Sequence, residues 1–257
     1  MDIGTYAATS AGILQMKKLE VQNNNLANTN TVGFKRQYLV QEEQPFEKTY
    51  AGALNNQSQY GKLDAKRAPG VIAYESVVDF SQGAIRYTGN PLDVALRNPT
   101  DFFVINTPQG TEYTRAGNFT ISQNNELITQ DGMRVMGDGG ALQIGLPGIS
   151  INQDGSIQAQ VGAGLPVVVG RLQVARFTDL KGLKPTEGAR FRNTGAAPTT
   201  VDGIIEPKSV EMSNASPITG MIDLIATNRA FDAYSRAAQS IDGMNQVAIT
   251  QVGKRTT

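Results

Sequence analysis

The chain has 257 residues, enough to bury a sizeable hydrophobic core in one large domain or two smaller ones. Its Lys and Arg residues equal its Asp and Glu residues in number, so the formal net charge is zero and no basic field is available for nonspecific nucleic-acid binding. It contains neither cysteine nor histidine, which excludes disulfides, most transition-metal sites and catalysis by Cys or His. We therefore expect no metal, no cofactor and no nucleic-acid partner.

The first 21 residues, "MDIGTYAATSAGILQMKKLEV", contain no basic leader and no long apolar run. This predicts neither a cleaved Sec signal peptide nor a transmembrane segment. The missing cysteines fit either a fold that needs no disulfide or a chain that passes into an oxidising compartment. If the chain leaves the cytoplasm, we expect a route without a cleaved signal.

Residues 3–27 form the first predicted element, an amphipathic helix. Apolar and small side chains recur there at a spacing of three and four, which places them in one narrow stripe. The principal members of this stripe are Ile3, Leu14 and Val21.

The segment "NNNLANTNTVGFKR" at residues 23–36, which covers the end of this helix and the residues after it, is rich in amides. Asparagine competes with the backbone for hydrogen bonds and is disfavoured inside helices. One interpretation is a fraying helix end, with Asn30 or Gly33 in a left-handed conformation as its cap. The other is that Asn25 and Asn28 hydrogen-bond a neighbouring chain, because amides fix register without charge.

Residues 37–70 are polar and Gly-rich with little periodicity, which predicts an extended connector. Residues 71–213 consist of short alternating runs separated by Gly, Asn and Asp, which is typical of an antiparallel β domain. Within it, "FTISQNNELIT" and "ISINQDGSIQA" align as strand, two-residue turn and strand, and predict two similar hairpins. Phe102 and Phe103 lie in an apolar run and are expected in the core.

Carboxylates beside these strands are the candidates for an alternative reading as a β-rich periplasmic, glycan-active enzyme. They are Asp79, Asp93, Asp101 and Glu112. Carboxylates beside turns are usually solvated or capping. We therefore expect them to be exposed near turns or subunit contacts, without a shared apolar pocket, and we expect no catalytic residue.

The last predicted element is a second helix over residues 217–252. Ser216 is a plausible N-cap, and Pro217 suits the first turn, where its missing N–H costs nothing. Both terminal stripes are thin and rich in alanine, so we expect the helices to pack on each other or on neighbouring copies. The stripe of this helix contains Met221, Leu224, Phe231 and Ile241.

Four segments resemble the flagellar rod and hook protein family, in the family's order and over nearly the whole chain. They are "NNLANTNTVGFKR", "VDFSQGAIRYTGNPLDVALRNPTDFFVI", "EYTRAGNF" and "EMSNASPITGMIDLIATNRAFDAYSRAAQSIDGMNQ". Two features depart from the family pattern: "NPT" at 98–100 replaces glycines, and Ser216, Pro217 and Gly220 alter the usual start of the C-terminal helix. These departures affect helix-start details rather than the family.

The resemblance implies an α+β fold in which the terminal helices pair as a coiled-coil-like inner domain and a mainly antiparallel β domain is inserted between them. The implied divisions are 1–36 with 214–257 as the helical inner domain, 37–70 as the connector and 71–213 as the outer domain. It also implies that Gly33, Phe34 and Lys35 form the turn after the first helix, with Phe34 anchoring it. Lys35 and Arg36 would then bind carboxylates of a neighbour.

The implied function is that of a structural subunit of the basal-body rod, which assembles helically, transmits torque and lines the export channel. The implied partners are copies of the chain, other rod proteins and the flagellar type III export apparatus, which needs no cleaved signal. The implied location is the periplasmic rod of the basal body. The "TGNPLDV" segment favours a proximal rod protein, whereas "GFKR" and the connector length favour a distal rod protein. We expect the proximal type.

Overall fold

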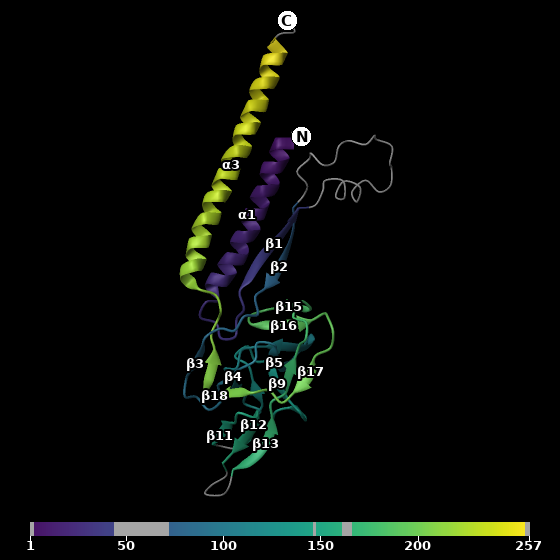
Figure 1. Ribbon diagram of the computed structural model, residues 1–257, viewed down its shortest axis with the longest axis vertical. Helices are drawn as coiled ribbons and strands as arrows, with labels where there is room; N and C mark the ends of the chain where they lie inside the picture. Colours follow the sequence, from purple (N-terminus) through teal and green to yellow (C-terminus); the bar gives the residue numbers. More distant parts are fainter. Residues whose placement is uncertain (1–2, 44–71, 146–147, 161–165, 255–257) are drawn as a thin grey trace, which may run out of the picture. The chain divides into compact units, whose positions relative to one another are not determined.

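The computed structural model describes residues 3–43, 72–145, 148–160 and 166–254 (Figure 1). Within this part of the chain, two long helices flank a middle region of many short strands, which confirms the predicted α+β class. The chain divides into two compact units. The helical unit comprises Met1–Leu26, Gln37–Val77 and Pro217–Thr257, and the β unit comprises Ala27–Arg36 and Val78–Ser216.

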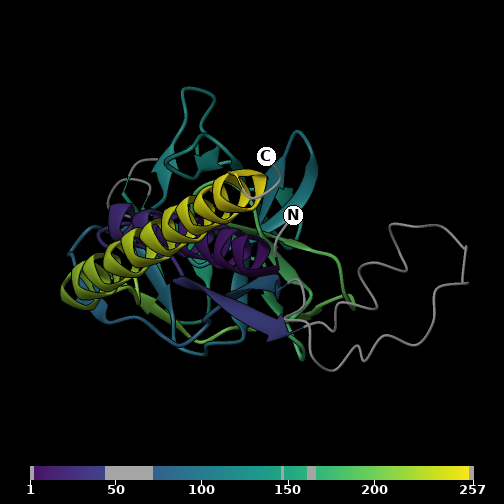
Figure 2. The same cartoon turned by 90° about the horizontal axis from the view of Figure 1, so that it is seen from above.

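The helical unit contains the two helices and a small sheet. Helix α1 spans Ile3–Ala27 and helix α3 spans Pro217–Lys254, close to the predicted ranges. They lie side by side in both views (Figures 1 and 2). Strands β1, Gln37–Glu43, and β2, Ile72–Val78, pair in a two-stranded sheet. The predicted connector thus begins with a strand, and its remaining residues, 44–70, lie outside the described residues.

Local chemistry accounts for the start of α3. Pro217 is its first residue, as predicted, because a proline there loses no helical hydrogen bond. Gly220, one turn later, faces α1: a Cβ at this position would lie 3.8 Å from the Leu26 side chain, an ordinary van der Waals distance, so α1 does not require glycine there. Neither helix of the described chain is long and apolar enough to cross a membrane.

The β unit consists of short strands connected by tight turns. They are β3 Ile85–Tyr87, β4 Val94–Leu96, β5 Asp101–Thr107, β6 Gly110–Thr114, β7 Thr120–Ile121, β8 Leu127–Ile128, β9 Arg134–Gly137, β10 Gly140–Ala141, β11 Ile149–Ile151, β12 Ser156–Ala159, β13 Val167–Arg171, β14 Val174–Arg176, β15 Leu183–Pro185, β16 Arg190–Asn193, β17 Thr199–Val201, β18 Ile205–Pro207 and β19 Ser209–Glu211. Every strand pair of this unit whose register the structure describes is antiparallel, as the sequence predicts.

Strand β5 lies at the centre of the main sheet. It pairs with β6 along one edge and with β9 and β14 along the other. The sheet runs in the order β15, β16, β6, β5, β9, β8, β7, with β17 beside β14 and β10 beside β9. Separate small sheets are formed by β11, β12 and β13, by β18 with β4, and by β19 with β3. The last two strands before α3 in the sequence, β18 and β19, thus pair with β4 and β3, the first strands of the unit.

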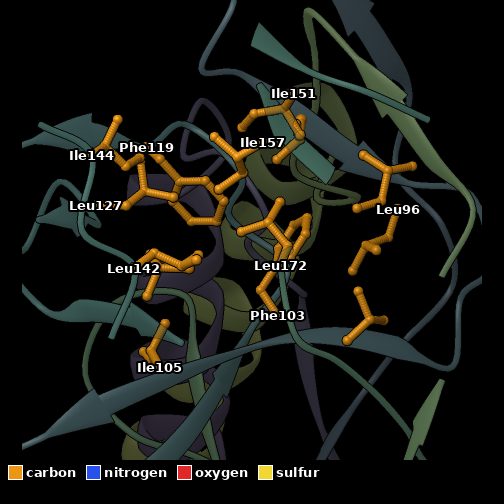
Figure 3. Packing of buried hydrophobic residues seen from close by; sticks show 14 residues of the cluster. Leu96, Phe103, Ile105, Phe119, Leu127, Leu142, Ile144, Ile151, Ile157 and Leu172 are labelled. Atoms are coloured by element: carbon orange, nitrogen blue, oxygen red, sulfur yellow. The ribbon is translucent and has the colours of Figure 1, made fainter. Parts of the chain in front are cut away.

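Phe102 and Phe103 are fully buried, as expected, and they serve different faces of β5. Successive side chains of a strand point to opposite faces, so the two rings enter two separate clusters. Phe103 belongs to a cluster of mainly aliphatic side chains that includes Leu127, Ile157 and Leu172 (Figure 3). Phe102 packs edge-to-face against Phe177, with ring centroids 5.5 Å apart. The β unit therefore has a core on both faces of its main sheet.

The two predicted hairpins are present as β7–β8 and β11–β12. Ser122 N–H donates to Glu126 O and Asn152 N–H donates to Ser156 O, and these pairs close the two loops. Each loop therefore has three residues, 123–125 and 153–155, rather than the two predicted. In each loop the third residue is left-handed: φ is 59° at Asn125 and 79° at Gly155. The hydrogen bonds also match, since Asn125 N–H donates to Ser122 O and Gly155 N–H donates to Asn152 O, both at 3.0 Å. Three-residue hairpin loops commonly consist of a type I turn followed by one left-handed residue, and the third loop residue takes that place here.

Candidate functional site

The segment after α1, residues 27–36, is a closely packed part of the β unit. Gly33 has φ +71°, and a Cβ there would lie 2.2 Å from the Ala116 nitrogen, so the position requires glycine. Its N–H donates to the carbonyl of Glu211 at 2.8 Å. Phe34 is 3% exposed, which gives it the buried position that an anchor of the turn requires.

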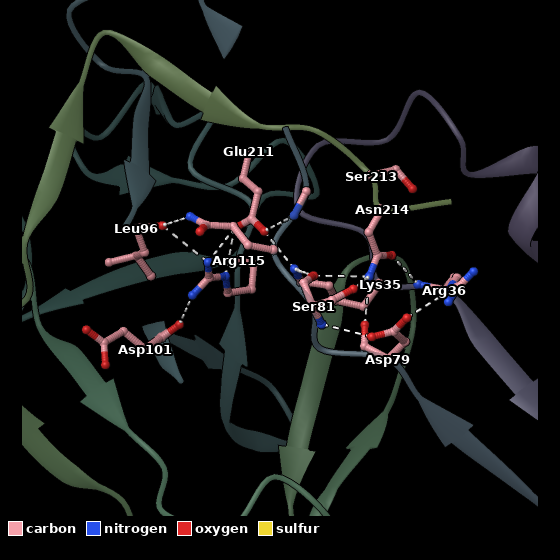
Figure 4. A network of polar contacts seen from close by, with 12 residues as sticks. Lys35, Arg36, Asp79, Ser81, Leu96, Asp101, Arg115, Glu211, Ser213 and Asn214 are labelled. Carbon is pink, nitrogen blue, oxygen red and sulfur yellow. Dashed lines mark hydrogen bonds and ion pairs between the residues drawn. The ribbon is translucent and has the colours of Figure 1, made fainter. Parts of the chain in front are cut away.

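Lys35 enters a buried ion network, which consists of Lys35, Arg115 and Glu211 (Figure 4). The Lys35 ammonium donates to Glu211 Oε1 and to the Ser81 carbonyl, both at 2.6 Å. On the other side, Arg115 Nε donates to Glu211 Oε2 at 2.8 Å. All three side chains are 0% exposed. Lys35 binds a carboxylate as expected, but that carboxylate belongs to its own chain and not to a neighbour.

The buried ion network holds two cations and one carboxylate. Burial lowers the pKa of Lys35, while the opposite charge of Glu211 works to raise it. Asp101 does not supply the second anion, because its carboxylate accepts from the Arg176 guanidinium at 2.7 and 2.9 Å. The N–H groups of Arg115 that remain instead donate to backbone carbonyls, including that of Leu96 at 3.2 Å.

A second group of contacts, which we call the polar clasp, consists of Arg36, Asp79 and Asn214 (Figure 4). The Arg36 N–H donates to Asn214 Oδ1 at 2.8 Å, and Asn214 Nδ2 donates to the Asp79 carbonyl at 2.8 Å. The Arg36 guanidinium donates to Asp79 Oδ2 at 2.8 Å. These residues stand within two positions of the places where the chain leaves or enters the β unit, at 36, 78 and 216. The polar clasp therefore holds three chain ends of the β unit together.

The helical unit has a comparable contact at its own chain ends. Asn25 Nδ2 donates to the Gln37 carbonyl at 2.7 Å, and the Gln37 N–H donates back to Asn25 Oδ1 at 2.8 Å. The Ser76 hydroxyl donates to the Gln37 side chain at 3.1 Å. The Asn25 amide thus pairs with the backbone as another strand would. Asn28 accepts a hydrogen bond from the Thr31 hydroxyl at 3.0 Å. A place for either asparagine at a subunit interface stays a prediction.

The four candidate carboxylates are engaged separately, each by its own partners. Asp79 belongs to the polar clasp and Asp101 pairs with Arg176. Asp93 accepts from the Thr88 hydroxyl at 2.6 Å, and Glu112 accepts from Arg192 at 2.9 Å. The expectation that they are exposed is wrong for three of them, because Asp93, Asp101 and Glu112 are at most 7% exposed. The cations and hydroxyls that approach them compensate for their burial.

Most residues of the predicted helical interface face the interior of their own unit. Leu14 is buried, and Val21, Leu224, Phe231 and Ile241 are partly covered. Met221 is the exception, with 55% of its surface exposed. The burial of Ile3 lies outside the described residues. We call the covered side of α3, which also includes Thr227 and Ala238, the covered face.

The sequence interpretation named Met221 but missed that it belongs to a second apolar row on α3, which we call the open face. At 3.6 residues per turn, it lies roughly opposite the covered face. Its side chains are 53–71% exposed: Ile218, Met221, Ile222, Ile225, Met244 and Val247. The spacing at 218, 222 and 225 carries the signal in the sequence. A search that looks for a single apolar stripe does not find this row, because the covered stripe is sufficient to predict an amphipathic helix.

Comparison with known proteins assigns the chain to a family of axial structural proteins. Residues 6–35 match the family described as "Flagella basal body rod protein". Residues 99–159 match "Flagellar hook protein FlgE/F/G D1 domain", and residues 206–251 match "Flagellar basal body rod FlgEFG protein C-terminal". The first and last of these matches contain Lys35 and Glu211, the two ends of the buried ion network.

Two relatives come from Caulobacter vibrioides. The chain is 31% identical to its flagellar basal-body rod protein FlgG, over 93% of this chain and 95% of that protein. It is 29% identical to its rod protein FlgF, over 99% of both chains. FlgG of Bacillus subtilis is 30% identical over 92% of this chain and 95% of the relative. The chain belongs to the flagellar basal-body rod protein family and is a structural axial subunit of the rod.

Proposed function

We propose that the chain assembles into the rod through the open face of α3, while the covered face holds the helical unit together. The supporting observation is that one helix carries apolar rows on two opposite sides, of which only one is covered by the part of the chain that the structure describes. Exposed isoleucine and methionine side chains in a row are costly in water and mark an interaction surface. The partners are copies of this chain and other rod proteins, and the assembly transmits torque and lines the export channel.

Paired substitutions on α3 test this assignment. Ile222→Ser with Ile225→Ser should abolish incorporation into purified basal bodies, because both side chains would be buried only after assembly. The stability of the monomer should change by no more than about 0.5 kcal/mol, as is usual for surface positions. Asp242→Ser, at an exposed polar position of the same helix that lies off the open face, is the control that should leave assembly intact. Normal incorporation of the double variant would contradict the proposal.

We propose that the subunit is a proximal rod protein of the FlgF type. The alignments with FlgF from Caulobacter vibrioides and Rhizobium meliloti extend over 99% and 98% of this chain and 99% of each relative. Those with FlgG from Caulobacter vibrioides and Bacillus subtilis extend over 93% and 92%. Electron cryomicroscopy of basal bodies that carry a tagged copy should locate the tag at the membrane-proximal end of the rod. Density at the distal end would favour the FlgG type.

We propose that the chain reaches the periplasmic basal body by the flagellar type III route without signal cleavage and performs no catalysis there. Its relatives are rod proteins, and the candidate carboxylates are bound by cations and hydroxyls of the same chain. Mass spectrometry of rod-bound protein should give the mass of the uncleaved chain. Purified protein should release no fragments from peptidoglycan, and release that depends on Asp101 or Glu112 would revive the enzyme alternative.

A further inference from the structure

Strand β3 is exposed along its whole length, and we call its side away from β19 the open edge. All three residues of the strand are exposed. Tyr87 is 72% exposed and Ile85 is 40% exposed, although both side chains are large and mainly apolar. In the part of the chain that the structure describes, β3 pairs with β19 alone. Two large side chains are therefore held on the surface of the β unit, beside a strand with one partner.

The backbone of β3 alternates between β19 and the open edge. The Ala84 carbonyl accepts at 2.9 Å and the Thr88 N–H donates at 2.8 Å, both to residues that flank β19. Successive residues of an antiparallel strand direct their backbone groups to opposite sides. Ile85 and Tyr87, which alternate with these two, therefore direct their N–H and C=O groups to the open edge. An edge of this kind is a template for a further strand.

Close contacts hold both ends of the open edge in place. After β3, the Thr88 hydroxyl and the Asn90 amide donate to the Asp93 carboxylate at 2.6 and 2.9 Å. Before β3, a Cβ at Gly83 would lie 1.9 Å from the Met212 carbonyl oxygen, so the chain packs closely there. A segment that is already ordered loses little conformational entropy when it binds a partner. The open edge is therefore ready to accept a strand without rearrangement.

The charge of Arg86 argues against a second β3 as the partner strand. In an antiparallel pair of two β3 strands centred on Arg86, the two guanidinium groups would lie on opposite residues, and like charges in that position are destabilising. A two-fold contact also uses the same surface on both copies, so it closes at two. A subunit that repeats along an axial structure needs a contact between two different surfaces.

Strand β13 offers that second surface. It pairs with β12 alone in the described part of the chain, so it also has an edge to offer. Val167 is 52% exposed and Val168 is 59% exposed, and no charged residue occurs from Val167 to Gly170. A tyrosine beside a β-branched residue is a favourable cross-strand pair. Strands β3 and β13 lie at separate places in the β unit, so one copy does not pair its own two edges (Figure 1).

We propose that β13 of one copy of this chain adds as a strand to the open edge of β3 of a second copy. Tyr87 then covers the valines of β13, and Ile85 and Tyr87 gain backbone hydrogen bonds. The contact joins two different surfaces, so each copy keeps one edge for the next copy and the row can extend. The proposal rests on the proposed function only in that copies of the chain assemble with one another. It uses no residue of α3.

Disulfide cross-linking of the purified full-length protein tests this contact. The chain contains no cysteine, so introduced thiols react only with each other. Tyr87→Cys is mixed with Val167→Cys or with Val168→Cys under mild oxidation. Successive side chains of a strand point to opposite faces, so one of the two valine positions should lie on the face of Tyr87. That pair should form about tenfold more mixed dimer than a control pair, because docking raises the effective concentration of the thiols.

The control pair combines Tyr87→Cys with Glu187→Cys. The Glu187 side chain is 94% exposed and lies in the loop between β15 and β16, outside both edge strands. A mixed dimer with the valine variants that is no more abundant than in this control would overturn the proposal. A preference of Tyr87→Cys for itself would also overturn it, since this result would indicate a two-fold contact between open edges.

The same mixtures in the Ile222→Ser, Ile225→Ser background separate this contact from the open face of α3. The excess of mixed dimer should persist there, because β3 and β13 belong to the β unit. Its loss would overturn the proposal, by showing that the copies meet through α3. Incorporation of the Ile222→Ser, Ile225→Ser chain into basal bodies tests the proposed function separately and does not alter the cross-linking that we expect.

Discussion

The β unit and the helical unit solve the burial problem in different ways. In the β unit, large apolar side chains such as Phe102, Phe103 and Leu127 have no exposed surface. In the helical unit, Ile218 and Ile222 are 71% and 61% exposed. Among helical-unit residues whose burial is described, Leu14 is the one large apolar side chain that is buried. The difference teaches that one unit buries its own core, whereas the other leaves apolar side chains of α3 exposed, and these form the surface that we propose for assembly.

The core of the β unit gives the largest expected effect. Phe103→Ala should lower the free energy of unfolding of this unit by about 3–5 kcal/mol, because it removes a buried ring and leaves a cavity. Denaturant unfolding followed by near-ultraviolet circular dichroism measures the loss. Phe231→Ala makes the same truncation on the partly covered face of α3, and the midpoint of the β unit should then stay at the wild-type value. A similar loss from both variants would break the distinction between the units.

The helical unit should respond to its own buried residue. Leu14→Ala should destabilise α1 by about 2 kcal/mol, at the low end for a buried leucine, because the unit is thinly packed. Amide exchange along α1 should accelerate while the strands of the β unit keep their rates. Ile13→Ala, next to it but 49% exposed, should have little effect. If the two alanine variants behave alike, the covered face does not hold the helical unit together.

The polar clasp predicts that part of the free energy of unfolding of the β unit depends on pH. Burial works to raise the pKa of Asp79, but the bonds from Ser81 and the Arg36 guanidinium hold that pKa below its ordinary value. The unfolded chain then binds the proton more readily, so this stabilisation is present above the ordinary pKa of about 3.9 and is lost as pH falls through the lowered value. Because the Arg36 side chain is half exposed, the contribution should be below about 1 kcal/mol.

Asp79→Asn is the variant that tests this contribution. Its free energy of unfolding should lie below wild type at pH 7, and the gap should narrow as the pH falls through the lowered pKa of Asp79. A gap of constant size across this range would assign the loss to packing and not to the charge.

The smallest expected effect is a gain. Lys208 has φ 54°, and its carbonyl accepts from Thr88 N–H at 2.8 Å, so the left-handed conformation is held in place. Lys208→Gly should stabilise the β unit by about 0.5 kcal/mol, since relief of the left-handed backbone exceeds the added chain entropy. Lys181→Gly, at a position without positive φ, should destabilise it slightly. A loss of thermal stability in Lys208→Gly would mean that the Lys208 side chain contributes contacts beyond its backbone.

Features that depend on neighbours along the chain could be predicted from the sequence. The spacing of Leu14 and Val21 predicts the residue range of α1, and Pro217 predicts the start of α3. The alternation around Phe102 and Phe103 places β5, and the repeated turn residues place both hairpins. The count of loop residues was wrong, because the left-handed third residue depends on hydrogen bonds that close the turn and not on the residue types alone.

The buried ion network could not be predicted, although Lys35 was singled out. Its partner Glu211 is 176 positions away, and Arg115 lies between them in sequence, beside a strand. No local pattern distinguishes these three from solvated charges, since a charge becomes buried only when strands far apart in the chain enclose it. The burial of Asp101 and Glu112 was missed for the same reason.

The sequence by itself determined the two terminal helices, the antiparallel β strands between them and the rod family. These features depend on periodicity, on turn residues and on motifs of consecutive residues. Only the tertiary structure decided that residues 27–36 belong to the β unit, and that Lys35, Arg115 and Glu211 share one dry site. It also decided which of the two apolar sides of α3 is covered. Periodicity states that a side chain is apolar at a given angle around a helix, but the neighbour that buries it is fixed by packing between segments distant in the chain.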